Sequence, residues 1–282
     1  MRLKKLCMVF CLTTVFNFSY PMDSNIVKDS IIGCVAGVAE VAVDQPLVYI
    51  KNMVQQGKKI TLNPLIWWRG AGVNAASLAP ITAMQVATTN ALLKGLNNKQ
   101  PSGAEQTAAA FTAGALSGLV SGPAENVMLH QQNSGNTVYN TTKTLLQTHG
   151  MRGLYRGVTP AMLRDGGFTA GYMGLLPMLK KQLEKHTSMN EPTATLASGV
   201  GSGLVVGVVT HPFDRVKTYM QATLSEKESM ATTFANVYRN ESLKGLFKGL
   251  AARSTRVSMA VTIMGTVTDK LNKLLKKQEE KS

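Results

Sequence analysis

The chain has 282 residues, a formal net charge of +14 and a mean hydropathy of +0.01. That hydropathy is high for a soluble protein and low for a bundle of uniformly apolar helices, so it indicates helices that are apolar on one side only. The Lys and Arg residues are scattered beside apolar segments, and no basic patch interleaved with stacking aromatic residues occurs. Attraction to anionic lipid therefore explains the positive charge better than nucleic-acid binding does.

Metal-binding and catalytic motifs are missing from the sequence. Cys7, Cys11 and Cys34 form no CxxC pair, and the four His residues share no ligand spacing. They predict neither a disulfide framework nor a zinc site. The sequence contains no GxGxxG motif, Walker loop or nucleophile elbow, so we predict no enzyme activity, no metal and no cofactor other than a structural lipid.

The N-terminal segment, residues 1–25, resembles a signal. It places Arg2, Lys4 and Lys5 before an apolar run, as a secretory signal does, but no clear small-x-small cleavage site follows. Three interpretations stay open: an export-like segment of bacterial type, an extra hydrophobic anchor, or a tail before the first long helix.

Two short patterns then recur three times along the chain. The first is a proline followed nine positions later by glutamine, and a run of small residues that suits close helix packing precedes each proline. It occurs as "PLVYIKNMVQ" (46–55), "PAENVMLHQQ" (123–132) and "PFDRVKTYMQ" (212–221). The second is an aromatic residue, a cation and a glycine: "WRG" (68–70), "YRG" (155–157) and "FKG" (247–249).

These patterns divide the chain into three repeats at 26–100, 101–190 and 191–277, with a polar tail at 278–282. Each repeat holds two long helices, predicted near 26–54, 70–96, 104–131, 157–183, 194–222 and 249–276. Pro46, Pro123 and Pro212 are expected to kink the first helix of each pair. Three similar two-helix units predict an all-α membrane protein with six transmembrane helices and pseudo-threefold symmetry around a central cavity.

The two patterns resemble the mitochondrial carrier family, whose motifs are Px[DE]xx[KR] and [FWY][KR]G. The resemblance covers about residues 26–276 and implies a secondary transporter with one solute site, which alternates between the two faces of a membrane. It further implies a monomeric, multi-pass protein of the mitochondrial inner membrane.

The resemblance implies a ring of ion pairs that closes the matrix side, in which the acid of one repeat meets the base of the next. Glu125 would meet Lys217, and Asp214 would meet Lys51. The third pair would join Val48 and Met128, which are both apolar, so no buried charge is left alone. Alternatively, Asp214 and Lys217 pair along their own helix. The resemblance assigns a bracing role to three glutamines, Gln55, Gln132 and Gln221.

The aromatic–cation–glycine turns have chemistry of their own, because free N–H groups at a helix N-terminus attract an anion. The resemblance implies that they hold cardiolipin phosphates. Plain interfacial anchoring by aromatic and basic side chains is the alternative. The residues concerned are Trp68, Arg69, Gly70, Tyr155, Arg156, Gly157, Phe247, Lys248 and Gly249.

Ser77, Arg164 and Arg256 each lie seven positions after a turn glycine, and symmetry predicts that they face the cavity at mid-depth. Arginine inside an apolar helix is expensive, and its donors suit carboxylate or phosphate. The alternative is that the arginines snorkel or pair with carboxylates such as Asp165. The resemblance makes these the solute contacts, and the Arg164–Asp165 sequence resembles amino-acid carriers. Arginine would then hold the solute acid, and Asp165 its amine.

Two other functions stay open beside transport of an amino-acid-like solute. Two arginines could take the phosphates of ATP and ADP, and some secreted bacterial effectors that resemble carriers move adenine nucleotides in host mitochondria. The RRRMMM run of the ADP/ATP exchanger is absent. A non-transporting membrane scaffold of the same fold is the other alternative.

Overall fold

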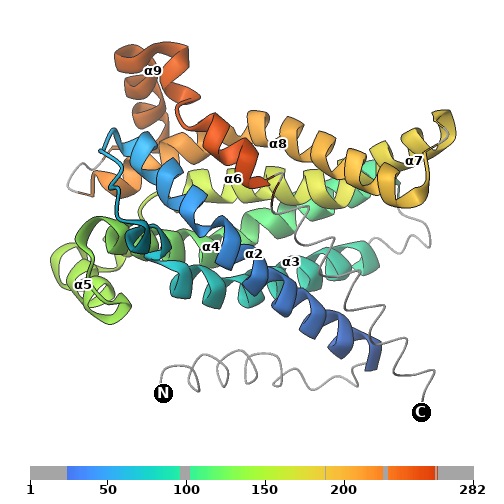
Figure 1. Ribbon diagram of the computed structural model, residues 1–282, viewed down its shortest axis with the longest axis horizontal. Helices are drawn as coiled ribbons and strands as arrows, with labels where there is room; N and C mark the ends of the chain where they lie inside the picture. The colour runs from blue at the N-terminus through green and yellow to red at the C-terminus, as the bar shows by residue number, and fades with distance from the viewer. Residues whose placement is uncertain (1–23, 96–101, 188, 225–227, 258, 260–282) are drawn as a thin grey trace.

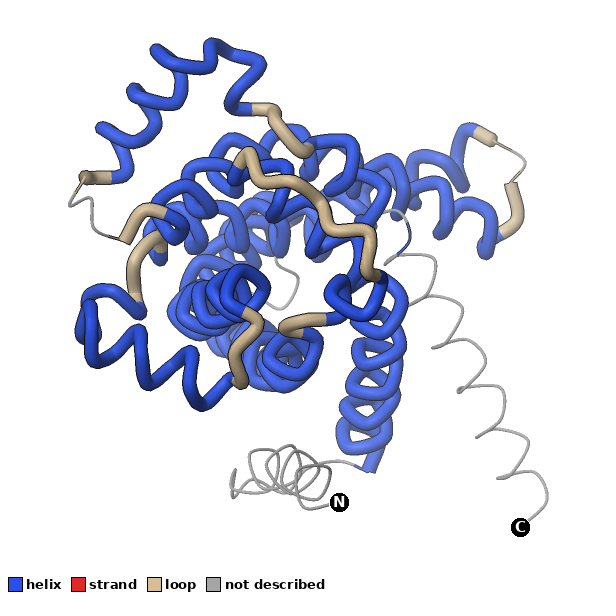
Figure 2. Tube along the Cα trace, turned by 60° about the vertical axis from the view of Figure 1, so that its left-hand side comes forward, coloured by secondary structure: helices blue, strands red, loops and turns tan. Residues whose placement is uncertain are grey.

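The computed structural model describes residues 24–95, 102–187, 189–224, 228–257 and 259. All regular structure in these residues is helical (Figure 2), which confirms the predicted all-α fold. Residues 1–23 of the signal-like segment, and most of the sixth predicted helix, lie outside this described part.

The long helices occur where the sequence predicts them, within a few residues at each end. The first three are α2 (Ser24–Gln56), α3 (Ala71–Gly95) and α4 (Gly103–Ser134). The fourth consists of α6 (Val158–Ala170), η2 (Gly171–Leu175) and α7 (Leu176–His186) in direct succession. The fifth is α8 (Glu191–Ala222), and the described start of a last helix covers 250–257. The pair members are linked by η1 (Pro64–Trp68), α5 (Val138–Leu154) and α9 (Met230–Leu246).

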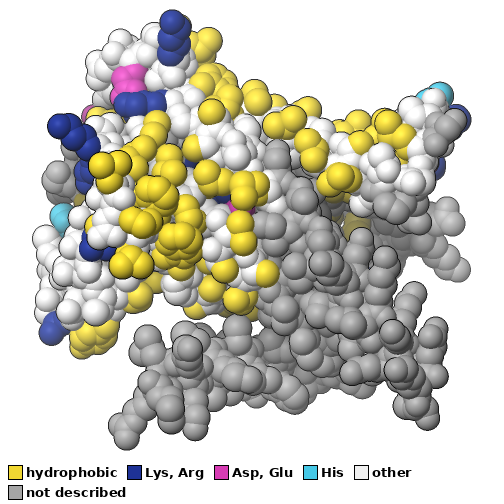
Figure 3. Space-filling view, viewed as in Figure 1, with side chains coloured by type: hydrophobic (Ala, Val, Ile, Leu, Met, Phe, Trp, Pro, Cys, Tyr) yellow, Lys and Arg dark blue, Asp and Glu magenta, His cyan; other side chains and the backbone are white. Residues whose placement is uncertain are grey.

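The three linking segments occupy equivalent places. Each packs on the first long helix of its own repeat: η1 on α2, α5 on α4 and α9 on α8. Figure 1 shows α5 and α9 at one end of the molecule and α7 at the other. In Figure 3 charged side chains gather at the end that holds α5 and α9, while hydrophobic side chains spread over the sides. The end with the linking segments is called the linker end below.

The turn glycines show how the three repeats join. Gly70, Gly157 and Gly249 have φ of 86°, 75° and 89°, and the second helix of each pair begins directly after them. A Cβ on Gly70 would overlap Met128 of α4, one on Gly157 would lie 3.1 Å from the Lys217 carbonyl oxygen of α8, and one on Gly249 would lie 3.2 Å from Gln55 Cγ of α2. Each repeat therefore contacts the next in the cyclic order first, second, third, first. Only glycine fits such a left-handed position at such a close approach.

The fourth long helix contains a short π-helix, η2, which the sequence analysis did not predict. The Leu176 N–H donates to the Gly171 carbonyl oxygen five residues earlier. Pro177 follows and has no N–H to continue the α-helical pattern, which explains why the helix widens at this point.

The linking helices α5 and α9 break at matching residues. Gly150 (φ 63°, ψ −167°) lies at the break in α5, and Ser242 (φ 59°, ψ −170°) lies at the break in α9. This region of backbone space belongs to glycine, and a non-glycine residue there costs on the order of 1–3 kcal/mol.

We therefore expect Ser242→Gly to raise the free energy of unfolding by about 1 kcal/mol, because the strain disappears while part of the gain is lost to a more flexible unfolded chain. Thermal unfolding in detergent measures this change. Gly150→Ser is the matched control and should lower the melting temperature. Equal melting temperatures for Ser242→Gly and the parent would contradict the account of this break.

Candidate functional site: a buried charge cluster

The ends of α2, α4 and α8 bring charged side chains together inside the bundle, near the linker end. Lys51 Nζ lies 3.0 Å from Asp214 Oδ2, and Lys217 Nζ lies 2.6 Å from Glu125 Oε2. These are the two pairings that the resemblance predicts, with the acid of one repeat on the base of the next. The alternative pair, Asp214 with Lys217 along α8, is not among the ion pairs of the described residues.

Arg164 of α6 also reaches this point, which the sequence analysis did not predict. Its Nη1 atom lies 2.8 Å from Glu125 Oε2 and 3.1 Å from Asp214 Oδ1. Its Nη2 atom lies 2.7 Å from Asp165 Oδ1, and Asp165 also accepts a hydrogen bond from the Ser121 hydroxyl. We call six residues the charge cluster: Lys51, Glu125, Arg164, Asp165, Asp214 and Lys217.

At the position of the third pair, the contact between the first and second repeats is apolar. Val48 and Met128, which occupy the positions of the third pair, are both buried. Next to them the Asn52 side-chain amide donates to Gln132 Oε1 at 2.7 Å. A hydrogen bond between neutral amides thus joins α2 and α4 where the family pattern has an ion pair.

The three glutamines of the repeated motif have different partners. Gln55 donates to Asp214 Oδ2 at 3.0 Å and so supports the Lys51–Asp214 pair. Gln132 donates to the Arg69 carbonyl oxygen, and Gln221 donates to the Gly122 carbonyl oxygen at 3.1 Å. Of the three glutamines, Gln55 is the one that contacts a carboxylate of the charge cluster, as a bracing role requires. Among the residues that the structure describes, no ion pair lies beside Gln132.

A second group of charges lies further from the linker end. Arg256 Nη1 lies 3.6 Å from Glu40 Oε1, which ties the last helix to α2. Ser77, the third predicted solute contact, donates to the Asn74 carbonyl oxygen of its own helix. Within the described residues, the predicted contacts are thus separated: Arg164 and Asp165 belong to the charge cluster, whereas Arg256 pairs with Glu40.

Two buried groups near this pair have unused hydrogen-bonding atoms. Asp44 is 1% exposed, and neither carboxylate oxygen has a hydrogen-bond partner. Arg253 is 4% exposed; its Nη2 atom donates to Thr210 Oγ1 at 2.6 Å, while Nη1 has no hydrogen-bond partner and lies 3.9 Å from Asp214 Oδ2. Buried charges are normally paired, so both groups need an explanation.

The direction of the helices places Asp44 and Arg253 at about the same depth. The Glu40–Arg256 contact fixes the register of α2 against the last helix. From Glu40, α2 runs toward the linker end and reaches Asp44 one turn later. Arg253 lies almost one turn closer to the linker end than Arg256, because the last helix starts there. Both groups therefore lie about one helical turn beyond the Glu40–Arg256 pair, on the side of the charge cluster.

Arg253 was not among the predicted site residues. It follows Gly249 by four positions and lies three before Arg256, on the same apolar helix. The cost of burying an arginine applies to it as much as to Arg256, so that cost was the signal that could have identified it.

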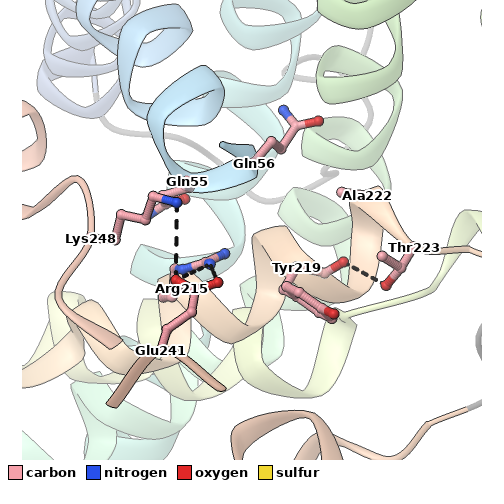
Figure 4. A pocket seen from close by; sticks show the side chains of 8 residues that line it. All are labelled: Gln55, Gln56, Arg215, Tyr219, Ala222, Thr223, Glu241 and Lys248. Atoms are coloured by element: carbon pink, nitrogen blue, oxygen red, sulfur yellow. Dashed lines mark hydrogen bonds and ion pairs between the residues drawn. The ribbon is translucent and has the colours of Figure 1, made fainter. Parts of the chain in front are cut away.

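The third predicted lipid turn borders a pocket of about 110 Å³ between the ends of α2 and α8 and the helix α9 (Figure 4). Arg215 Nη2 donates hydrogen bonds to both oxygens of the Glu241 carboxylate, at 2.8 and 3.1 Å, and Lys248 Nζ lies 4.0 Å from the same carboxylate. The lining residues are Gln55, Gln56, Arg215, Tyr219, Ala222, Thr223, Glu241 and Lys248. Glu241 therefore compensates part of the positive charge that a lipid phosphate would meet.

No group of three His, Cys, Asp or Glu side chains that could hold a metal ion occurs in the part of the chain that the structure describes. Lysine and arginine supply half of the charge cluster and do not ligate cations. The cluster is therefore suited to holding helices together or to binding charged solutes.

Comparison with known proteins gives a consistent result. The sequence model of the family described as mitochondrial carrier protein matches residues 99–187 and 188–279, which is well over half of the chain. A mitochondrial glycine transporter from Kluyveromyces lactis is 24% identical, and the match covers 86% of this chain and 95% of that protein. The tricarboxylate transport protein of Saccharomyces cerevisiae is 26% identical, over 85% of this chain and 92% of that protein. The mitochondrial glycine transporter of Xenopus laevis is 30% identical, but the match covers less than half of either chain.

Proposed function

The chain belongs to the mitochondrial carrier protein family, and from this premise we propose that it moves a small amino-acid-like solute across the mitochondrial inner membrane by alternating access. The glycine transporters among its relatives support this solute class. The tricarboxylate transporter supports a solute with a carboxylate.

The observation that carries the proposal is the pair of unused buried groups, Asp44 and Arg253. An amino acid has a carboxylate that suits the free Nη1 atom of Arg253 and an ammonium group that suits the free carboxylate of Asp44. The two groups lie at about the same depth, next to the charge cluster, and in this proposal one small solute contacts both. Arg253 shares the Asp214 carboxylate, 3.9 Å away, with Lys51 and Arg164, and Asp44 accepts no hydrogen bond, so a solute with both charges would compensate the two groups.

The surface of the bundle supports a location in a membrane. One stretch of α8, Thr193–Ala222, is long and apolar enough to cross a bilayer by length and composition. Leu204, Val205 and Val209 of this helix are exposed. In this proposal the long helices span the membrane as a monomer, with cardiolipin phosphates at the three aromatic–cation–glycine turns.

We expect Asp44→Asn to remove solute binding without destabilising the protein. The carboxylate has no partner to lose, and a neutral amide costs less to bury than an ion, so the melting temperature without solute should stay equal or rise. Binding of glycine should weaken at least about tenfold, which corresponds to about 1.4 kcal/mol. Thermal shift with glycine as the added ligand measures both effects. A parent-like response to glycine would contradict the assignment of Asp44.

A thermal-shift screen of the purified protein against amino acids, di- and tricarboxylates and adenine nucleotides tests the solute class, because a ligand of the folded state stabilises it by mass action. We expect amino acids to give the largest shifts, and these shifts to disappear in Arg253→Gln. Larger shifts with ATP or ADP would replace the amino-acid proposal by the adenine-nucleotide alternative. A flat screen, together with no solute uptake after reconstitution, would favour the scaffold.

A further inference from the structure

We infer that Arg164 and Asp165 form the third charge pair of the closed cluster and take over the role of the missing Val48–Met128 pair. The inference rests on the proposed function only in treating the cluster as the element that closes one side of a carrier. It assigns to these two residues a positioning role in the closed state, separate from solute contact.

The first observation is the charge composition of the cluster. The two pairs that the repeated motifs supply, Lys51–Asp214 and Glu125–Lys217, leave the position of the third pair to apolar side chains. Arg164 and Asp165 add one base and one acid at the same place, so the six residues hold three bases and three acids; Arg253, 3.9 Å from Asp214 Oδ2, is a fourth base beside them. A ring of three ion pairs has the same composition as the six residues. The pair has moved from α2 and α4 to adjacent positions on α6.

The second observation is the connection that the cluster makes between helices. An ion pair between positions 48 and 128 would join α2 to α4. In this structure the join is made through Arg164, whose Nη1 atom contacts Glu125 of α4 at 2.8 Å and Asp214 of α8 at 3.1 Å. Asp214 in turn contacts Lys51 of α2. One guanidinium group therefore completes the electrostatic chain from α2 to α4.

The third observation is the way in which Arg164 is held. Arg164 is 7% exposed. Its Nε atom donates to Asp165 Oδ1 at 2.8 Å, and its Nη2 atom lies 2.7 Å from the same oxygen. Ser121 of α4 donates to the other oxygen of Asp165. This leaves Nη1 directed at the acids of the other two helices. A planar arginine fork fits this task, whereas lysine, with a single charged nitrogen, cannot contact three carboxylates in the same way.

Double-mutant cycles in detergent test the inference. We expect Arg164→Gln to lower the melting temperature by roughly 5–10 °C, because three carboxylates lose a partner, of which Asp214 is buried and Glu125 and Asp165 are partly buried. The loss should be clearly smaller in the Glu125→Gln background. The matched control is Arg256→Gln, whose partner is Glu40; its effect should be the same with and without Glu125→Gln. Additive losses for Arg164 and Glu125 would overturn the inference.

A charge transfer supplies the second arm. Val48→Asp with Met128→Lys, added to Arg164→Gln with Asp165→Asn, should restore most of the lost melting temperature, since the third pair returns to its place between α2 and α4. No recovery would overturn the inference, provided that Val48→Asp with Met128→Lys folds in the parent; if that variant does not fold, the cycles alone decide. Both arms read stability without solute, so a wrong solute assignment leaves their outcome unchanged.

Discussion

Asp214→Asn is expected to lower the free energy of unfolding by about 3–5 kcal/mol, the largest loss for a single substitution in the charge cluster. Asp214 contacts Lys51, Gln55 and Arg164 directly and lies 3.9 Å from Arg253. Its carboxylate is almost completely buried, so its removal leaves cations without compensation in a place that water cannot reach. Thermal or chemical unfolding in detergent gives the size of the loss.

Glu241→Gln is the control for this prediction. Glu241 also pairs with an arginine, at 2.8 Å, but its side chain is 34% exposed. Its partner Arg215 is buried, but the amide oxygen of glutamine can still accept from it, and Arg215 also donates to the Gly245 carbonyl oxygen, so we expect a clearly smaller loss than for Asp214→Asn. If Asp214→Asn were as mild as Glu241→Gln, the cluster would not be the element that holds the linker end closed.

Val48→Asp together with Met128→Lys is expected to slow transport at least tenfold in the parent chain, because the closed cluster gains an ion pair that must separate in every cycle. A tenfold change corresponds to about 1.4 kcal/mol in the barrier, within what a buried pair supplies. The initial rate of solute uptake by reconstituted protein is the measurement.

The single substitutions behave differently from the pair. Val48→Asp or Met128→Lys alone strands a buried charge, and each should lower the free energy of unfolding by about 3–5 kcal/mol. Val48→Asn with Met128→Gln changes size and polarity without charge and serves as the matched control for the rate. Equal rates for the charged pair and this control would contradict the explanation that ion-pair separation limits transport.

The sequence predicted the helices and their pairing because the repeated motifs mark helix ends in all three repeats. Pro46, Pro123 and Pro212 lie inside α2, α4 and α8, and each turn glycine precedes the second helix of its pair. The cyclic order of the repeats was implied by the family resemblance, in which the acid of one repeat meets the base of the next. The match of the family model to residues 99–187 and 188–279 covers the second and third of these units.

The site could be predicted only in part, because side chains at equivalent positions of the three repeats contact different partners. Arg164 and Arg256 occupy equivalent positions, yet Arg164 contacts two acids of the charge cluster and Arg256 contacts Glu40. The neutral Asn52–Gln132 bond likewise has no counterpart in the motifs of the other repeats. Such differences depend on which partner lies nearest after packing, and a repeated motif does not record that.

Uptake of labelled glycine into liposomes, by the parent protein and by Asp44→Asn, tests the account most directly. We predict saturable uptake above that of protein-free liposomes for the parent, and uptake at least about tenfold lower for Asp44→Asn at an equal or higher melting temperature. Uptake by Asp44→Asn at the parent rate, or parent uptake no greater than that of protein-free liposomes for glycine and every other amino acid, would contradict it.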